Sequence, residues 1–201
     1  MLARMNIGAS IPLDQDLLAK IASRDEAAFA LLLDRHLENV RALAWRVLAN
    51  HEDVDDIAQE VFLKLWKNPQ SFTPGNAKFS TWLYRITLNA CIDRQRRTKT
   101  ANIIPIGEFI ETTVPDNAPT PEGAAINTSR SGRVAQAIAR LPERQRHAIA
   151  LSHFQELSNI EAASAMETTV EAVESLLGRA RRSLKNFLQN DIAELLDGTG
   201  T

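Results

Sequence analysis

The stretch that decides the fold runs from Lys78 to Arg97 and reads KFSTWLYRITLNACIDRQRR. It contains neither glycine nor proline, and Ser80 can cap a helix that begins at Thr81. At about 3.6 residues per turn, an apolar face repeats through this segment at Phe79, Leu83, Ile86 and Ala90. The stretch therefore predicts one amphipathic helix that packs against other helices.

A neighbouring face of the same helix carries side chains that suit a nucleic acid. Arginines bind phosphates, and aromatic rings stack on unpaired bases. The candidate residues for such contacts are Phe79, Trp82, Arg85, Asn89, Arg96 and Arg97. From composition alone, an ordinary amphipathic helix with a solvated basic end explains the same pattern equally well.

The segment Asp53–Lys67 predicts a second amphipathic helix, whose outer face is uncommon. Its apolar positions, from Val54 to Trp66, keep three-four spacing throughout. The opposite face mixes carboxylates and an amide with one leucine, in the set Asp56, Gln59, Glu60 and Leu63. A solvated acidic face is one explanation, and a docking surface for a basic partner is the other.

Two helix-start signals follow each other in the last third of the chain. Ser158–Glu161 and Thr168–Glu171 both match the capping box. They frame a short helix, Asn159–Ala165, then a tight turn without glycine and a longer basic helix. This order is typical of a helix-turn-helix, and a helical hairpin in a bundle gives the same signals.

Composition limits what else the chain can do. Its 201 residues carry 23 basic and 25 acidic side chains, so bulk electrostatic attraction to DNA is not expected. The lone cysteine, Cys91, fits a reducing cytoplasm, and the histidines show no metal-ligand spacing. We expect no catalytic residue, metal, cofactor or small-molecule substrate, and no membrane insertion. Several prolines and the lack of a helical period mark residues 98–130 as a flexible linker.

The segment FSTWLYRITLNACIDRQRR resembles the minus-ten recognition segment of bacterial sigma factors, above all the extracytoplasmic-function (ECF) group. DVDDIAQEVFLKLW is similar to the sigma segment that docks on the clamp helices of RNA polymerase. From LPERQRHAIALSHF onward, the chain resembles the minus-thirty-five recognition domain, with Met166-Glu167 in place of the common Leu-Gly at the turn. The resemblance extends from about Asp14 to Leu188, with its motifs in the family's order.

This resemblance implies an all-α fold of two small helical domains joined by a flexible linker. Sigma region 2 would occupy residues 1–97, the linker 98–130, region 4 residues 131–190, and a loose acidic tail 191–201. Region 2 would bind the minus-ten element through the helix quoted first. It would bind the polymerase clamp through Asp56, Gln59, Glu60 and Leu63.

Region 4 would bind the polymerase flap and read the minus-thirty-five element. Its candidate contacts are Glu174, Ser175, Gly178, Arg179, Arg181 and Arg182. A glutamate can accept from a cytosine amino group, a serine can hydrogen-bond a base, and arginines bind phosphates. Gly178 would permit close backbone approach, whereas the plainer interpretation is a helix weakened by about 1 kcal/mol.

The resemblance implies the function too. The chain would be a cytoplasmic, non-enzymatic alternative sigma factor that recruits the polymerase core to specific promoters. The loop at residues 68–78 would form a pocket for a flipped base, with its lining side chains left open. An anti-sigma factor would hold the protein inactive. The alternatives are a sigma mimic that titrates an anti-sigma factor, which has no need of DNA-facing cations, and a helix-turn-helix repressor, which leaves the first half unexplained.

Overall fold

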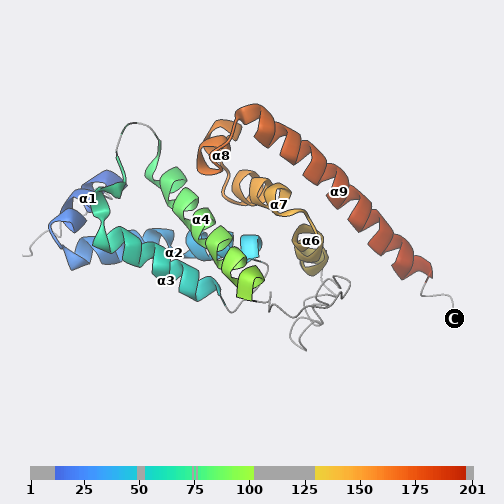
Figure 1. The fold of residues 1–201 in the computed structure, drawn as a ribbon, viewed down its shortest axis with the longest axis horizontal. Coiled ribbons are helices and arrows are strands. Elements are labelled where there is room, and N and C mark those ends of the chain that lie inside the picture. Colours follow the sequence, from blue (N-terminus) through green and yellow to red (C-terminus); the bar gives the residue numbers. More distant parts are fainter. Residues whose placement is uncertain (1–11, 49–52, 74, 76, 102–129, 198–201) are drawn as a thin grey trace, which may run out of the picture.

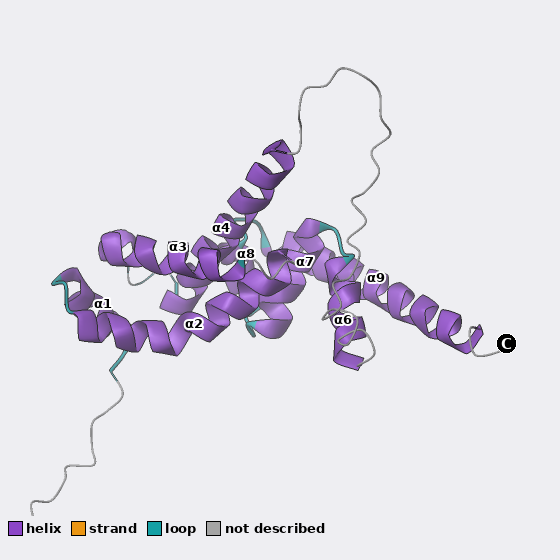
Figure 2. Ribbon diagram, turned by 90° about the horizontal axis from the view of Figure 1, so that it is seen from below, coloured by secondary structure: helices purple, strands orange, loops and turns teal. Residues whose placement is uncertain are grey.

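All regular elements in the part of the chain that the structure describes are helices (Figure 2). The computed structural model describes residues 12–48, 53–73, 75, 77–101 and 130–197. Within these ranges the predicted all-α fold is confirmed, and no helix there is both long and apolar enough to cross a lipid bilayer. The helices form a first module, α1 to α4, and a second module, α6 to α9, which lie side by side (Figure 1).

The first module packs long amphipathic helices around one core. It contains α1 (Asp14–Ala22), α2 (Glu26–Leu48), α3 (Val54–Lys67), a single 3-10 turn (Pro69–Ser71) and α4 (Phe79–Ala101). Asp25 caps α2, because its Oδ1 accepts a hydrogen bond from the Ala28 amide at 3.0 Å. The three-four spacing of apolar residues places one stripe of each helix inside, including the fully buried Leu32, Val40, Leu43, Ile57, Val61, Leu65, Leu83 and Leu88.

Side chains also fasten α1 to α2. Asp14, in the first turn of α1, accepts from Arg35 Nη1 at 2.5 Å. The other oxygen of the same carboxylate lies 3.0 Å from His36 Nε2. The short helix is therefore held by its buried leucines on one side and by the contacts of Asp14 with Arg35 and His36 at its start.

The second module has the short-turn-long order that the sequence predicts. It contains α6 (Arg130–Ala139), α7 (Glu143–Ile149), a π-helical turn (Ala150–Phe154), α8 (Asn159–Ala165) and α9 (Val170–Asp197). Pro142 directly precedes α7, and its carbonyl accepts from the amides of Gln145 and Arg146. A proline fits there because the first-turn amides have no intrahelical acceptor.

One of the two predicted capping boxes forms and the other does not. Ser158 accepts from the Glu161 amide, and the Glu161 carboxylate accepts from the Ser158 amide, so the first box is confirmed. The prediction for Thr168–Glu171 is wrong, because Thr169 caps α9 by accepting from the Ala172 amide at 3.2 Å. Adjacent threonines offer two starting points, and the turn after α8 selects the later one.

Two helices are longer than the sequence analysis expects. α4 begins at Phe79, so the prediction of a start at Thr81 with Ser80 as its cap is wrong. The helix continues to Ala101, beyond the Arg97 boundary, so the linker cannot start at residue 98. α9 continues to Asp197, and the prediction of a loose tail is wrong for residues 191–197. Neither extension contains glycine or proline, so nothing in the backbone stops the helix. The rest of the predicted linker, 102–129, lies outside the described residues.

The two modules pack against each other. α8 lies on α4, and α2 contacts α6, α7 and the π turn. The buried apolar side chains of both modules join into one cluster. At the edge of the contact, Gln155 Nε2 donates to the Asn39 carbonyl at 3.2 Å, and the Arg46 guanidinium lies 4.0 Å from the centroid of the Phe154 ring.

Candidate functional site

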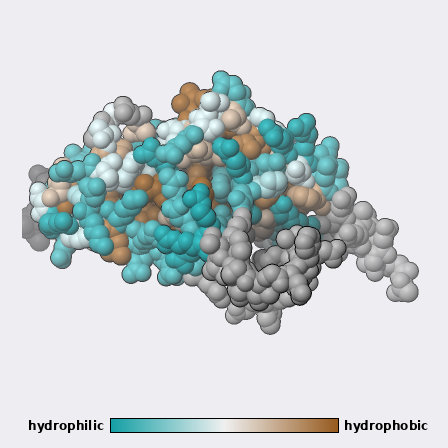
Figure 3. Space-filling view, viewed as in Figure 1, coloured by the Kyte–Doolittle hydropathy of each residue, from teal (hydrophilic) through white to brown (hydrophobic). Residues whose placement is uncertain are grey.

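The outer face of α3 presents an acidic surface with a leucine inside it. Asp56, Gln59, Glu60 and Leu63 are all exposed, and Leu63 is 45% exposed. They line one open hollow of about 620 Å³, whose rim is completed by Lys64, Lys67, Asn68 and Arg94. The visible face of the molecule is mostly hydrophilic, with small and separate apolar patches (Figure 3). We call the four predicted residues the α3 surface, and the structure does bring them together.

Arg94 of α4 borders the α3 surface. Its Nη1 contacts Asp53 and lies 3.5 Å from Asp56 Oδ2. The contact explains why Asp53, directly before α3, makes no side-chain cap for that helix. Arg94 therefore ties α4 to α3 and neutralises part of the acidic surface.

An aromatic cluster lies at the start of α4. The Phe79 and Trp82 rings are stacked with centroids 5.6 Å apart, and Phe72 contacts both at 5.5 and 5.8 Å. All three rings are buried. Since Phe72 comes from the segment between α3 and α4, it fastens that segment to the helix. The predicted stacking residues Phe79 and Trp82 are thus part of the packed structure.

A pocket of about 230 Å³ opens beside this cluster. For comparison, a cavity of about 150 Å³ in a protein core holds a benzene ring. The Thr81 hydroxyl is buried there and has no hydrogen-bond partner, which leaves one polar group available to a ligand. The lining comes from Ser71, Phe72, Thr73, Ala77, Thr81, Trp82 and Arg85 of the first module, and from Ser164 of α8.

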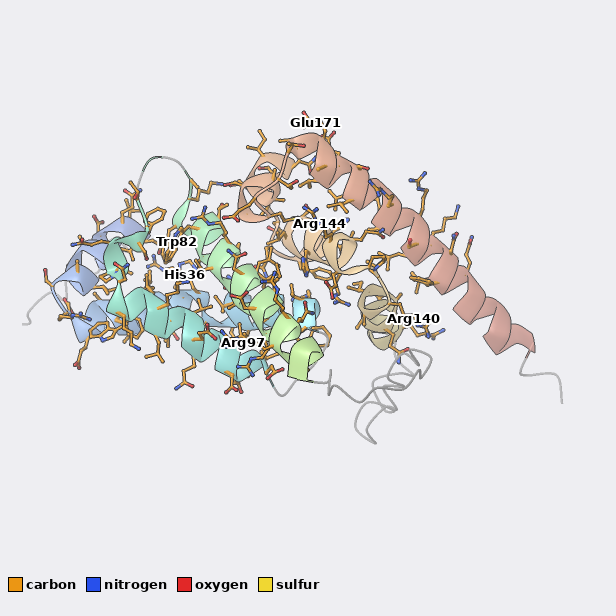
Figure 4. The ribbon with its side chains drawn as sticks, in the orientation of Figure 1. His36, Trp82, Arg97, Arg140, Arg144 and Glu171 are labelled. Carbon is orange, nitrogen blue, oxygen red and sulfur yellow. The ribbon has the colours of Figure 1, made fainter. Side chains whose placement is uncertain are left out.

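The remaining predicted residues of α4 spread along the helix away from the pocket. Arg85 is half-buried and lies at the pocket's edge, while Asn89, Arg96 and Arg97 are exposed. Trp82 lies near the start of α4 and Arg97 near its far end (Figure 4). The set is therefore a strip along one helix, and only its first part borders the pocket.

The predicted residues of α9 form a polar strip on its outer side. Glu174, Ser175, Arg179, Arg181 and Arg182 are exposed, and Gly178 is half-buried. Two local bonds order the strip. Asn159 Nδ2 donates to Glu174 Oε1 at 3.3 Å, and Arg179 Nη2 donates to Ser175 Oγ at 2.7 Å. A Cβ added at Gly178 would have no neighbour within 4 Å, so packing does not require glycine there.

The loop at residues 68–78 does line a pocket, through Ser71, Phe72, Thr73 and Ala77, which the sequence analysis did not single out. Two further lining residues, Thr81 and Ser164, escaped the sequence analysis altogether. Thr81 lies in the decisive stretch, but no pattern marks a hydroxyl as unpartnered. Ser164 reaches the pocket from the other module, which no local signal could show.

The lone thiol takes no part in these surfaces. Burial, above all, raises the pKa of Cys91 to about 12, with nearby carboxylates adding to the effect. Such a thiol stays protonated and unreactive at neutral pH. This agrees with a packing role for Cys91 in α4.

Comparison with known proteins identifies the family. The chain matches two protein-family models, Sigma-70 region 2 over residues 32–100 and Sigma-70, region 4 over residues 131–184. It is 32% identical over 179 residues to the ECF RNA polymerase sigma factor SigW of Bacillus subtilis, covering 86% of this chain and 95% of SigW. The chain belongs to the ECF sigma factors. It is an alternative sigma factor of transcription initiation, as the sequence motifs predict.

Other relatives are similar to this chain over nearly their whole length. The ECF RNA polymerase sigma-E factor of Escherichia coli is 32% identical over 182 residues, which cover 88% of this chain and 94% of that protein. Among solved structures, CnrH in complex with the cytosolic domain of CnrY matches with a TM-score of 0.64 at 29% identity, over 89% of this chain and 98% of CnrH. The sigma factor RpoE of Bartonella quintana, in complex with the anti-sigma factor NepR, matches with a TM-score of 0.65 at 25% identity, over 80% of this chain and 96% of RpoE.

The family assignment divides the surfaces between the two sigma regions. The region 2 match spans α3, α4 and the segment between them, and so contains the α3 surface and the pocket. The region 4 match spans α8 and the basic part of α9. Ser164 is thus a region 4 residue that lines a region 2 pocket.

Proposed function

We propose that this sigma factor divides its work among three surfaces. The α3 surface docks on the clamp helices of RNA polymerase, the α4 strip with its pocket binds the minus-ten element, and the outer strip of α9 binds the minus-thirty-five element. Region 4 also contacts the polymerase flap. The protein performs no catalysis and acts in the cytoplasm, where its polymerase partner works.

Leu63 is the observation that carries the docking proposal. It remains 45% exposed among side chains that would otherwise form an ordinary acidic face. An apolar residue at the centre of a charged patch contributes binding energy only when a partner covers it. The surrounding carboxylates then favour a basic partner by electrostatic complementarity.

The pocket supports the minus-ten assignment. It is lined by the Trp82 ring, by the charged Arg85 and by the unpartnered Thr81 hydroxyl. A flipped base gives up stacking worth a few kcal/mol, and a pocket of this chemistry can repay it. Farther along α4, the exposed Arg96 and Arg97 suit the phosphates of the same strand.

In the α9 strip, the residues suited to reading base edges differ from those suited to binding phosphates. Ser175 and Glu174 are the polar groups that can reach base edges, and the local bonds to Arg179 and Asn159 hold them in place. Arg181 and Arg182 are exposed cations suited to phosphates, which fix position and not sequence. We also propose an anti-sigma factor as a partner, because similar proteins such as RpoE of Bartonella quintana have been solved in complex with one.

Run-off transcription with purified core polymerase and a promoter library tests the assignment. The chain should produce transcripts from a defined subset of promoters. An Asp56→Arg/Leu63→Asp variant should reduce them at least about tenfold, since it reverses a charge and removes the apolar centre.

The matched control makes the same two changes elsewhere. Asp34 and Leu31 are exposed on α2, with Leu31 at 54%, and we assign neither to a docking surface. Asp34→Arg/Leu31→Asp should leave transcription within about twofold. Equal losses in the two variants would contradict docking through α3, and no promoter-specific transcript from the unaltered chain would contradict the proposed division of labour.

A further inference from the structure

The outer strip of α9 begins with two carboxylates and becomes basic only farther along. Glu171 and Glu174 lie about one turn apart and are both exposed. Glu171 lies at the outer edge of the molecule, near the start of α9 (Figure 4). The first turn of a helix attracts phosphates through its free amides and its dipole, and two carboxylates beside it oppose that attraction. The start of the strip is therefore poorly suited to the DNA backbone, and base edges are what remains for it to contact in a bound duplex.

Glu174 is held in place from the neighbouring helix. Asn159, at the start of α8, donates through Nδ2 to Glu174 Oε1 at 3.3 Å, across 15 positions of sequence. Asn159 itself has a fixed position, because the residue before it forms the capping box of α8. A glutamate side chain has many rotamers, and a bond to an ordered partner reduces the conformational entropy lost when the carboxylate contacts a ligand. The carboxylate is thus pre-organised on the outer side of α9.

The bond to Asn159 also decides what the carboxylate can still accept. An ionised carboxylate has no hydrogen to donate, so every hydrogen bond that it makes is one that it accepts. Oε1 of Glu174 already accepts from Asn159, and among the described residues no group donates to Oε2. Glu174 therefore offers a ligand one open acceptor and no donor.

One of the four bases presents an edge in the major groove that matches this acceptor without a conflict. Guanine presents two acceptors, N7 and O6, and thymine presents the acceptor O4 beside a methyl group, so both repel a carboxylate. Adenine presents the N6 amino group next to the acceptor N7, which lies beside the incoming oxygen. Cytosine presents the N4 amino group with no acceptor of its own beside it. Cytosine is therefore the base that fits Glu174 best.

We propose that Glu174 selects cytosine at one position of the minus-thirty-five element, and that Asn159 is the residue that positions it. The inference rests on the proposed function of α9 as the reader of that element. Arg181 and Arg182 fix the register of the helix on the duplex through phosphates, and Glu174 supplies discrimination between sequences. A good contact of this kind favours its base by about tenfold.

The test is run-off transcription by the full chain with core polymerase, on promoters that share one minus-ten element and carry random bases in the minus-thirty-five region. The unaltered chain should favour cytosine about tenfold at one position. At that same position, Glu174→Arg should favour guanine and Glu174→Gln should favour adenine, because arginine and glutamine match those two edges. Glu171→Gln is the matched control, since it removes an exposed carboxylate one turn earlier in the same helix, and it should keep cytosine.

Asn159 is tested by the base preference that it controls, and not by total activity. Asn159→Asp keeps the size of the side chain and suits the first turn of α8, but it replaces the donor by a second carboxylate. The preference for cytosine at the Glu174 position should fall from about tenfold to about twofold, with the preferences at other positions unchanged. A merely structural role would lower transcription from all promoters alike and keep the tenfold preference, which would reject Asn159 as the positioning residue.

The outcomes separate this inference from the proposed function. A minus-thirty-five preference that is the same in the unaltered chain and in both Glu174 variants would overturn the role of Glu174 and leave α9 as the reader of that element. A preference for another base at the position that the Glu174 variants change would overturn the assignment of cytosine. Promoter-specific transcripts without any preference in the minus-thirty-five region would overturn both the inference and the function proposed for α9.

Discussion

The two surfaces of region 2 that we propose as partner sites differ in their exposure. The α3 surface is open, and Leu63 is exposed in the middle of it. The pocket end of α4 is covered by α8, with Arg85 engaged by a carboxylate. The proposed polymerase surface is therefore exposed, whereas the pocket end of the proposed promoter surface is packed against α8.

The pocket at the start of α4 depends on aromatic packing, and Phe72→Ala should disrupt that packing. Phe72 is buried against both Phe79 and Trp82, so its loss should lower the free energy of unfolding by about 3 kcal/mol or more. Urea denaturation measures this change. Ile160→Ala is the control, because Ile160 is 71% exposed and its truncation should cost under about 1 kcal/mol. Equal costs would show that Phe72 does not hold the pocket wall.

Acid should weaken region 4 through a buried histidine. Burial, and then the neighbouring Arg146, lower the pKa of His147 to about 4. Between this value and the unfolded pKa of about 6.5, only the unfolded chain binds the proton. The free energy of unfolding should therefore fall by up to about 3 kcal/mol as the pH drops from about 6.5 to about 4.

Denaturation midpoints at several pH values measure this dependence. A His147→Gln variant should lose most of the slope, and a change at the exposed His153 should keep it. An unchanged slope in His147→Gln would assign the acid sensitivity to other groups.

Glu167→Gly should stabilise the fold and, at the same time, weaken the contact between the two modules. Glycine relieves the left-handed backbone and should raise the free energy of unfolding by about 1 kcal/mol. The same change removes the Arg85 contact, so the distance between the modules should increase. Thermal denaturation and energy transfer between dyes at the exposed positions Gln70→Cys and Asn186→Cys measure both effects. A less stable variant, or one whose modules stay closed, would contradict the role given to Glu167.

Gly178→Ala tests whether DNA approaches the backbone of α9 in region 4. No atom lies within 4 Å of the added Cβ, so the helix should gain about 0.8 kcal/mol in its interior. Retained activity at promoters with that gain would make Gly178 a plain weak point of α9. Loss of minus-thirty-five recognition with the same gain would show that DNA approaches the backbone there. Denaturation and run-off transcription measure the two effects.

Local signals in the sequence predicted the elements well. The Ser158–Glu161 box, the three-four spacing of α3 and the unbroken Lys78–Arg97 stretch all involve residues within a few turns of one another, and the structure confirms them. The errors were local ambiguities. Thr168 and Thr169 are equivalent as caps on sequence grounds, and an acidic segment such as 191–197 can either fray or continue a helix.

The arrangement of the modules could not be predicted. The contact between Arg85 and Glu167 joins residues far apart in the chain, and each taken alone is an ordinary exposed charge. Ser164 is a small polar residue in a short helix and gives no sign that it lines a pocket in another module. Only the replacement of glycine by Glu167 at the turn was visible beforehand, and its meaning depends on what the side chain touches.

The most direct test of the account is the distance between region 2 and region 4 before and after core polymerase is added. Dyes at Gln70→Cys and Asn186→Cys report it, and a chain with the Asp56→Arg/Leu63→Asp changes serves as the control that cannot dock. We expect one short distance in the free protein and a longer one with polymerase, with no change in the control. The same distance with and without polymerase, in a sample that supports promoter-specific transcription, would contradict the proposal that the two regions dock on separate parts of the polymerase.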